Sequence, residues 1–340
     1  MAAFYDARGN TYFVASPQEL GGFTELARTA PEAARTRERW TRRAIERICG
    51  RQNFPEGPHA GATKRYRSDG LLVGPFPDEH AFALLIVNTD GTLAERSGNG
   101  LTIFSQWLLD TGRVNRSDAF FLRVYLGTHE SRFVEARVEA GEREAHQGFW
   151  IDMGVPAYGL AAVGAAPEHV GVSEFDGRVV ARVYALEKID ASWVCSQFVN
   201  VGNPHCVTFL KRPDLLPSME QLGSEQWMRA LGAIANSTES GGMRGAGSPC
   251  RNGINLQWAC VIGPDSIEAR VFERGEGPTL SSGSSATAVA SAARKLGLLE
   301  AKTVNVRMPG GVAPVRFDER NGSLERVMLF GEAQQANPPI

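Results

Sequence analysis

The chain has 340 residues, of which 43% are hydrophobic, and its 36 basic and 38 acidic side chains give a formal net charge of −2. This length allows two domains of about 150 residues, each with its own hydrophobic core. The near balance of charge disfavours nucleic acid or an anionic membrane surface as a partner.

Short alternating or apolar runs separated by Gly, Pro, Asn and Asp dominate the chain and predict many β-strands. In chain order, strands are expected at residues 12–15, 70–73, 81–87, 120–125, 133–138, 149–153, 179–186, 207–210, 254–261, 267–272, 304–308, 313–317 and 326–330. Because few helical patterns interrupt these runs, the sequence favours a mixed α+β fold.

Three segments show helical patterns. Residues 31–51 are strongly charged and carry apolar side chains at helical spacing from Trp40 to Ile48, which predicts a surface helix. Residues 101–109 and 286–296 are apolar around nearly the whole helical circumference, which is typical of helices buried on all sides. A sheet wrapped around one central helix, repeated twice, fits this pattern.

Two serines begin the two apolar helices in the same way. Ser97-Gly98-Asn99-Gly100 leads into a run that ends at Gly112, and Ser282-Gly283-Ser284-Ser285 leads into a run that ends at Gly297. A small polar N-cap, a following Gly and a Gly stop are the signals of a capped helix. Because helix N-termini present backbone N–H groups that favour anions, the pair predicts two proton-handling half-sites related by internal duplication.

The sequence carries few signs of a cofactor, a metal or a membrane. The five cysteines are scattered without CxxC spacing, which disfavours a disulfide framework and a zinc site. No run of 18 apolar residues and no secretory signal pattern is present, so a cytoplasmic protein is expected. No lysine lies in a setting typical of a pyridoxal enzyme.

Several longer motifs occur in order along most of the chain. They are Gly9-Asn10-Thr11-Tyr12-Phe13-Val14, Asn88-Thr89-Asp90-Gly91, Ile151-Asp152-Met153-Gly154-Val155-Pro156, Gly202-Asn203-Pro204-His205-Cys206-Val207 and Glu273-Arg274-Gly275-Glu276-Gly277-Pro278-Thr279. With the two Ser-Gly helix starts, they make the chain resemble diaminopimelate epimerase, a cofactor-independent amino-acid racemase family. Its wider superfamily includes proline racemase and phenazine-type isomerases.

The resemblance implies an α+β fold of two pseudo-symmetric domains, each a β-barrel-like sheet around a central buried helix. We expect one domain at residues 1–145 with 326–340 and the other at 146–325, with Ser97 and Ser282 facing one another across the cleft between them. The implied partner is a small-molecule amino acid; no cofactor, metal, nucleic acid or membrane is implied, and a homodimer is allowed. Two segments, 17–62 and 212–250, are interpreted as insertions.

The implied reaction is the removal and return of an α-proton. The resulting carbanion lies beside a carboxylate, so a site of this kind needs anion-stabilising N–H groups and an acid and a base on opposite faces. In the family, two helix-tip cysteines supply the thiolate base and the thiol acid. The matching positions here are Ser97 and Ser282. An aliphatic hydroxyl has a pKa roughly five units or more above that of a thiol, about 7 kcal/mol, which a helix dipole of at most about 2 kcal/mol does not offset.

The resemblance also assigns roles to other residues. Amide side chains expected to bind the substrate's polar groups are Asn10, Asn88, Asn203 and Asn255. Glu273 and Arg274 are expected to meet an amine and a carboxylate, with Arg274 holding a buried charge. Backbone amides for the reacting carboxylate are expected from Gly98, Asn99, Gly283 and Ser284. His205 and Asp69 are expected to support the site, and His205 is also the candidate for a replacement base. Gly70 stands where some members carry a substrate-facing Gln.

The serine pair leaves several readings open. The chain is a homologue that uses another acid or base, a binding protein that has lost the chemistry, or a Cys-to-Ser variant that traps substrate. Within enzymes, the rival is a sister isomerase or lyase whose substrate has a more acidic C–H bond, for which a weaker base suffices. The most specific expectation is epimerisation of LL- to meso-diaminopimelate, a step of lysine biosynthesis, by two-base proton transfer.

Overall fold

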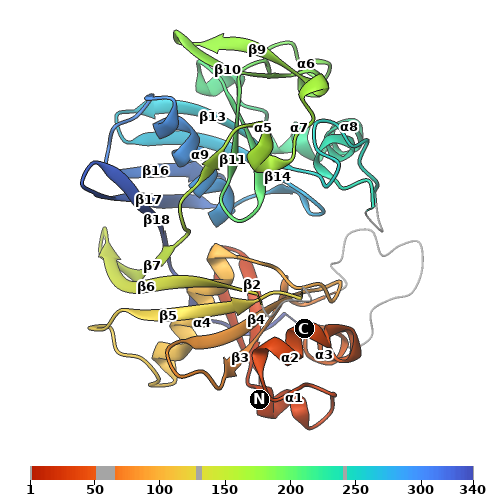
Figure 1. Cartoon of the computed structure of the whole chain (residues 1–340), viewed down its shortest axis with the longest axis vertical. Helices are drawn as coiled ribbons and strands as arrows, with labels where there is room; N and C mark the ends of the chain where they lie inside the picture. Colours follow the sequence, from red (N-terminus) through yellow and green to blue (C-terminus); the bar gives the residue numbers. More distant parts are fainter. Residues whose placement is uncertain (1, 51–65, 128–131, 240–242, 340) are drawn as a thin grey trace. The chain divides into compact units, whose positions relative to one another are not determined.

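The computed structural model describes residues 2–50, 66–127, 132–239 and 243–339, and the chain divides into two compact units (Figure 1). Unit 1 comprises Met1–Ile151 and Gly331–Ile340, and unit 2 comprises Asp152–Phe330. Among the described residues, no helix is both long enough and apolar enough to span a bilayer.

Unit 1 is built on a mixed sheet. Its strands are β1 (Ala3–Ala7), β2 (Asn10–Ala15), β3 (Gly70–Phe76), β4 (Phe82–Asn88), β5 (Phe120–Tyr125), β6 (Phe133–Arg143), β7 (His146–Asp152) and β19 (Gln334–Gln335). The pairs β2–β3 and β4–β5 are parallel, and the pairs β1–β2, β3–β4, β5–β6, β6–β7 and β1–β19 are antiparallel.

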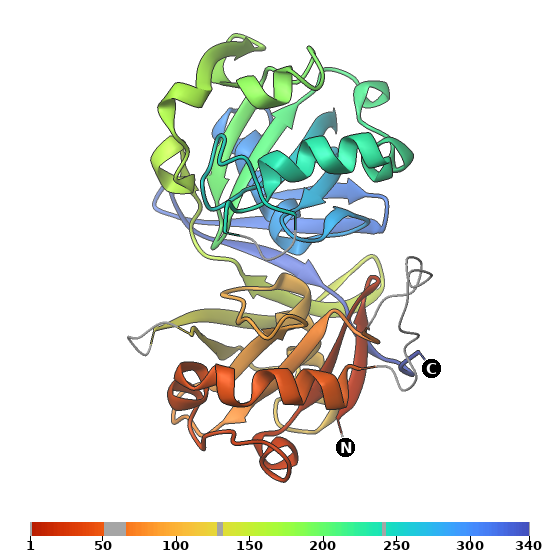
Figure 2. The ribbon, with the colours of Figure 1, turned by 90° about the vertical axis from the view of Figure 1, so that its right-hand side faces the viewer.

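Helices cover both faces of the unit 1 sheet. The central helix α4 (Gly98–Asp110) contacts β1, β2 and β19. The short helices α1 (Pro17–Gly21), α2 (Ala30–Arg35) and α3 (Thr41–Ile48) contact β3, β4 and β5 (Figure 2). Because both faces are covered, β3 and β4 are buried along nearly their whole length, which explains their unbroken apolar sequences.

The single surface helix expected at 31–51 is wrong. The chain forms α2, a 3-10 turn at Arg37–Arg39 and then α3, while residue 51 lies outside the described residues. Trp40, between the two helices, is fully buried, and its Nε1 donates to the carbonyl oxygen of Ala33 at 2.8 Å. Burying this indole and satisfying its N–H requires the chain to turn between the helices, so the segment joins the core of unit 1.

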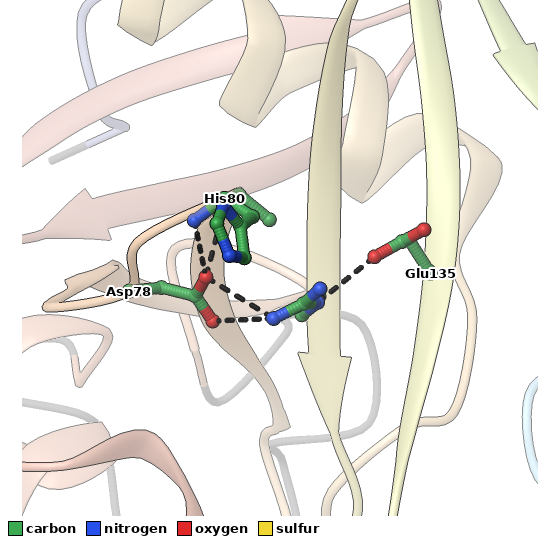
Figure 3. A network of polar contacts seen from close by, with 5 residues as sticks. Asp78, His80 and Glu135 are labelled. Atoms are coloured by element: carbon green, nitrogen blue, oxygen red, sulfur yellow. Dashed lines mark hydrogen bonds and ion pairs between the residues drawn. The ribbon is translucent and has the colours of Figure 1, made fainter.

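A polar network holds the turn before β4 in unit 1 (Figure 3). The carboxylate of Asp78 accepts the backbone N–H groups of His80 at 2.9 Å and Ala81 at 3.1 Å, and it pairs with Arg123 at 3.0 Å. Arg123 also pairs with Glu135 on β6 at 2.9 Å. Burial raises the pKa of Asp78, but the hydrogen bonds from His80 and Arg123 together lower it by more, so the net shift is downward.

The strands of unit 2 also form parallel and antiparallel pairs. They are β8 (Ala157–Tyr158), β9 (Val170–Phe175), β10 (Arg178–Val183), β11 (Ser196–Asn200), β12 (Pro204–Phe209), β13 (Asn255–Gly263), β14 (Ser266–Glu273), β15 (Gly277–Thr279), β16 (Thr303–Met308), β17 (Gly311–Arg320) and β18 (Ser323–Gly331). The central helix α9 (Gly283–Lys295) contacts β11 to β14, β16 and β17. The remaining helices are α5 (Leu160–Val163), α6 (Tyr184–Glu187), α7 (Met219–Gly223) and α8 (Glu225–Ala235).

The strand expected at 179–186 ends early. Strand β10 stops at Val183, and Tyr184–Glu187 form α6. Val183 and Leu186 both lie in the unit 2 core with Trp193. In a strand, residues three apart point to opposite faces, whereas a helical turn brings them to one side, so the turn buries both side chains.

The two units repeat one strand order, which confirms the predicted duplicated α+β fold. In unit 2 the pairs β12–β13 and β14–β16 are parallel, as β2–β3 and β4–β5 are in unit 1. The pairs β11–β12, β13–β14 and β16–β17 are antiparallel, as β1–β2, β3–β4 and β5–β6 are. Along the chain, the central helix α4 comes between β4 and β5, and the central helix α9 comes between the matching strands β14 and β16.

This repeat explains the two segments interpreted as insertions. Parallel neighbours need a long crossover connection, and the crossover from β2 to β3 contains α1 to α3. The crossover from β12 to β13 contains α7 and α8 (Figure 2). Both segments are therefore helical connections at matching points of the duplicated fold, although residues 51–62 and 240–242 lie outside the described residues.

Candidate active site

In unit 1, Ser97 caps the central helix. Its backbone is extended (φ −138°, ψ 113°), and its Oγ accepts the N–H of Gly100 at 3.0 Å. The N–H groups at the first positions of a helix have no acceptor within the helix, so those of Gly98 and Asn99 mark an anion-favouring end. The hydroxyl of Tyr12 lies 3.5 Å from Ser97 Oγ, which places a phenol beside the helix start.

In unit 2, Ser282 caps the second central helix with nearly the same geometry. Its backbone is extended (φ −148°, ψ 120°), and its Oγ accepts the N–H of Ser285 at 3.3 Å. Ser282 Oγ also donates to Glu273 Oε1 at 2.7 Å and lies 3.5 Å from Ser284 Oγ. Ser282 is only 5% exposed and Glu273 is half-buried, so their hydrogen bond is partly shielded from water.

Other predicted residues of unit 1 lie on the strand of Tyr12, directly before β3 or on β4. Asp69 accepts the side-chain amide of Asn10 at 3.2 Å and the backbone N–H of Thr11 at 2.8 Å. Asn88, at the end of β4, donates to Thr92 Oγ1 at 2.9 Å. The sheet register pairs Tyr12 with Gly70 and Gly70 with Asn88, so Tyr12 and Asn88 project from the same face.

Gly70 has no room for a side chain. A Cβ at this position would lie 2.7 Å from Tyr12 Cε1 and 2.6 Å from the carbonyl oxygen of Val87. The glutamine that some members of the resembled family carry here therefore does not fit this chain, because the Tyr12 ring occupies that space. The glycine and the tyrosine form one packing arrangement.

In unit 2, a buried hydrogen-bond chain holds Asn203. Gln257 Nε2 donates to His205 Nδ1 at 2.9 Å and to Ser285 Oγ at 3.1 Å. His205 Nδ1 is then an acceptor, so Nε2 carries the proton and donates to Asn203 Oδ1 at 2.7 Å. Burial lowers the pKa of His205 to about 3 against the weaker opposing effect of the Gln257 hydrogen bond. Because both ring nitrogens are engaged and the ring is fully buried, His205 orients Asn203 and does not serve as the replacement base.

Asn255 fixes the backbone that carries Glu273 and Arg274. It is 5% exposed, and its Oδ1 accepts the backbone N–H of Arg274 at 2.8 Å. The side chain of Arg274 is exposed, and its guanidinium donates to the carbonyl oxygen of Asn252 at 2.9 Å. The expectation of a buried charge at Arg274 is therefore wrong, because the side chain lies at the surface of unit 2 and finds its partner in a loop carbonyl.

The key residues occupy matching places in the two units. Asn10 and Tyr12 begin β2 with the spacing that Asn203 and His205 show at β12. Gly70 is the register partner of Tyr12, as Asn255 is of His205. Asn88 and Glu273 end their strands nine residues before Ser97 and Ser282, respectively. The duplication thus extends from the fold to the site.

Comparison with known proteins identifies relatives of this chain. A family model described as diaminopimelate epimerase matches residues 244–335. Diaminopimelate epimerase 2 of a Nostoc species is 33% identical to this chain over 309 residues, covering 90% of this chain and 85% of the relative. The chain belongs to the diaminopimelate epimerase family. The diaminopimelate epimerase of Xylella fastidiosa is 28% identical over 252 residues, covering 74% of this chain and 73% of its own.

Solved structures share the fold at low identity. A phenazine biosynthesis protein of the PhzF family from Bacillus anthracis has a TM-score of 0.60 at 11% identity and covers 99% of this chain and 96% of its own. A hydroxyproline epimerase from Agrobacterium vitis has a TM-score of 0.56 at 12% identity and covers 99% of this chain and 90% of its own. Because this chain belongs to the diaminopimelate epimerase family, it is an isomerase of the epimerase and racemase type.

Hydrogen bonds join most of the predicted site residues in unit 2, whereas in unit 1 the bond between two predicted residues is that of Asn10 with Asp69. In unit 2 they link Asn203 to His205, Asn255 to Arg274, and Glu273 to Ser282. Sequence reasoning missed three residues that the structure adds, namely Tyr12, Gln257 and Ser285. The first two carried a usable signal, because each follows a predicted asparagine by two residues on a strand and therefore shares its face.

Proposed function

We propose that this protein is a cofactor-independent epimerase that interconverts LL- and meso-diaminopimelate by proton transfer at one α-carbon. Two observations support this specific activity within the isomerase class. The first is the activity for which its relatives in the diaminopimelate epimerase family are named. The second is the pair of serine-capped helix starts, each with N–H groups suited to a carboxylate that gains charge as the proton leaves.

The observation that carries the proposal is the 2.7 Å hydrogen bond from Ser282 Oγ to Glu273 Oε1. A serine hydroxyl alone is a poor base, but a carboxylate that already accepts its hydrogen bond can take its proton. As Ser282 Oγ bonds to the α-hydrogen, the C–H electron pair stays on carbon and the serine's own proton moves to Glu273. The carboxylate thus supplies the ionisable group that the hydroxyl lacks.

The remaining residues are proposed to bind the substrate. Asn10, Asn88, Asn203 and Asn255 offer amides, and the backbone N–H groups of Gly98, Asn99, Gly283 and Ser284 receive the reacting carboxylate. Arg274, exposed in unit 2, receives the carboxylate of the distant head group through its guanidinium. Asp69 and His205 hold Asn10 and Asn203, respectively, through the hydrogen bonds described above.

A second candidate is favoured by one feature, the presence of a hydroxyl at both helix starts. A sister isomerase or lyase with a more acidic C–H bond needs less from its base than an amino-acid epimerase does. Such an enzyme would bind an anionic substrate at the same N–H groups and move a double bond or eliminate a group after proton removal. The test below separates this activity from epimerisation.

The test is α-deuterium incorporation into LL-diaminopimelate in heavy water, followed by NMR, with formation of the meso isomer measured by chiral chromatography. We expect slow exchange and slow epimerisation by the full chain, with loss of both in Ser282→Ala and Glu273→Gln. Ser281→Ala is the matched control, because Ser281 is the half-buried neighbour of the cap and should leave the rate unchanged. Binding measured by calorimetry without any exchange would instead identify an amino-acid-binding protein or the sister isomerase.

A further inference from the structure

The two helix starts differ in the ionisable group that contacts the serine. Ser282 donates to the carboxylate of Glu273, whereas Ser97 lies 3.5 Å from the phenol of Tyr12. The position of unit 1 that matches Glu273 is Asn88, an amide that does not ionise. The position of unit 2 that matches Tyr12 is His205, whose two ring nitrogens are hydrogen-bonded to Asn203 and Gln257. The same fold therefore pairs one serine with a carboxyl group and the other with a phenol, which is a much weaker acid.

Packing holds the phenol at this place. Tyr12 is 6% exposed, and its ring fills the space over Gly70, where even a methyl group would come within 2.7 Å of Cε1. Strand β2 fixes its backbone through antiparallel pairing with Tyr5 and parallel pairing with Gly70. A side chain confined in this way keeps its hydroxyl beside Ser97 Oγ, which also accepts the N–H of Gly100.

We propose that Tyr12 is a positioning residue that relays a proton through Ser97, and this inference rests on the proposed function. When the carbanion takes the Ser97 hydroxyl proton, the carbon's electron pair forms the new C–H bond and the Oγ–H bond breaks. The phenol proton then passes to Oγ, and the negative charge ends on the Tyr12 oxygen. In the reverse direction the phenolate accepts the Ser97 proton while Oγ removes the α-hydrogen.

The pairing of Ser282 with Glu273 and of Ser97 with Tyr12 determines which serine accepts a proton and which donates one in the resting enzyme. Carboxylic acids are ionised near neutral pH, whereas phenols ionise near pH 10. The Ser282 side is therefore ready to accept a proton, and the Ser97 side is ready to give one. We expect the substrate isomer whose α-hydrogen is removed through Ser282 to exchange faster than the isomer whose α-hydrogen is removed through Ser97.

The first experiment needs no catalytic activity. Ser97→Cys is made in a Cys195→Ser background, because Cys195 is the one half-buried cysteine while the other four are buried. Alkylation of position 97 by iodoacetamide is followed against pH by peptide mass spectrometry, with and without Tyr12→Phe. A phenol that donates to the thiolate lowers the thiol pKa, so we expect Tyr12→Phe to slow alkylation at neutral pH about 3- to 10-fold.

Matched variants define the outcome of that experiment. In Ser282→Cys the alkylation profile should be the same with Tyr12 or Phe, since the Ser282 contact is Glu273. An unchanged profile at position 97, or equal changes at both positions, overturns the proposed contact. This result stands whether or not the protein epimerises diaminopimelate, so it separates the failure of this inference from the failure of the proposed function.

The second experiment measures the relay itself. Tyr12→Phe keeps the ring over Gly70 and should lower exchange through Ser97 about 10- to 100-fold in kcat with little change in KM, because it removes a proton donor and no substrate contact. Tyr5→Phe is the control: Tyr5 is the buried cross-strand partner of Tyr12, and its hydroxyl donates to Asp110 at 2.8 Å. Tyr5→Phe should lower thermal stability and leave exchange unchanged. Equal exchange rates for wild type and Tyr12→Phe would reduce Tyr12 to a packing role and overturn the proposal.

Discussion

The helix start at Ser97 and the helix start at Ser282 show which parts of the duplicated site are alike in the two units. Both serines adopt extended backbone, accept the N–H three residues on and begin a 13-residue helix. The side chains beside them differ, with a phenol at one and a carboxylate at the other. Backbone capping is therefore shared by the two halves, whereas the ionisable side chain beside the serine is specific to each.

The supporting residues differ as well. In unit 2 the first turn of α9 is tied by Ser285 to a buried glutamine and histidine, which fixes Asn203. In unit 1 the matching asparagine, Asn10, is held by the carboxylate of Asp69. One half thus orients its amide with a neutral ring and the other with a carboxylate.

The largest effect is expected from giving both helix starts thiols. In Ser97→Cys with Ser282→Cys, α-proton exchange of LL-diaminopimelate in heavy water should rise by several orders of magnitude, because the thiol pKa lies roughly five units below that of an aliphatic hydroxyl. Either single change should achieve far less, since acid and base act as a unit. The comparison of the two single variants measures how unlike the two helix starts are.

The double variant also has a decisive negative result. Circular dichroism and calorimetry establish that it folds and binds diaminopimelate. If it does so and still exchanges no deuterium, the two sites differ from those of an epimerase by more than their proton-transfer atoms, and the sister isomerase becomes the better description.

The second prediction concerns acid sensitivity in unit 2. Burial lowers the pKa of His205 to about 3, below the value of about 6.5 expected in the unfolded chain. The unfolded state therefore binds more protons below pH 6.5, so stability is full above that pH and falls as the pH drops towards 3. The slope attributable to this one group is at most about 1.4 kcal/mol per pH unit.

Urea unfolding at several pH values between 7 and 4 tests this expectation. His205→Gln should be less stable at neutral pH and should show a shallower pH dependence than the wild type. His80→Gln, which alters an exposed histidine of unit 1, is the matched control for the substitution itself. Identical slopes for His205→Gln and the wild type would show that His205 is not the group that responds.

The sequence alone predicts the features of the two helix starts that depend on local chemistry. Serine caps, glycine stops and fully apolar helices specify α4 and α9, because each signal acts within a few residues. Pairing Ser282 with Glu273 was not predicted, although both residues were singled out. Their contact depends on how β14 ends relative to the helix, which no local pattern encodes.

Two wrong predictions also show that local sequence patterns do not determine tertiary packing. The 31–51 segment has the period of one helix, but burial of the Trp40 indole divides it into two. The exposed guanidinium of Arg274 was expected to be buried, since a motif states a residue's role and not its solvent exposure. Tertiary packing decided both cases, and it also placed Tyr12 beside Ser97.

A third prediction follows from the exposure of Arg274. Because its guanidinium is solvated and bonded to a loop carbonyl, Arg274→Ala should weaken diaminopimelate binding only about 5- to 10-fold, about 1–1.4 kcal/mol. Calorimetry with Arg251→Ala as the control, an exposed arginine of the neighbouring loop, should show no change for the control. Unchanged affinity in Arg274→Ala would remove this residue from the recognition of the distant head group, and a loss beyond about 100-fold would restore the buried-charge expectation.

The smallest effects are expected in the polar network of unit 1 (Figure 3). The side chain of Asp78 is 8% exposed and that of Glu135 is 40% exposed, although both pair with Arg123. Asp78→Asn should lower the free energy of unfolding by about 1 kcal/mol, because it weakens hydrogen bonds from the His80 and Ala81 backbone and from Arg123. Glu135→Gln should cost about 0.3 kcal/mol, since an exposed ion pair is screened by water and salt.

The pH dependence of this network completes the contrast with unit 2. The folded-state pKa of Asp78 is lowered, so its stabilisation is present above the unfolded value of about 3.9 and is lost as the pH falls through the lower folded value. This window lies mostly below that of His205, which begins at about pH 6.5. Chemical unfolding at pH 7 and pH 3 should therefore show a smaller penalty for Asp78→Asn at the acid end. An equal penalty at both pH values would mean that the carboxylate charge of Asp78 adds nothing to the turn that it caps.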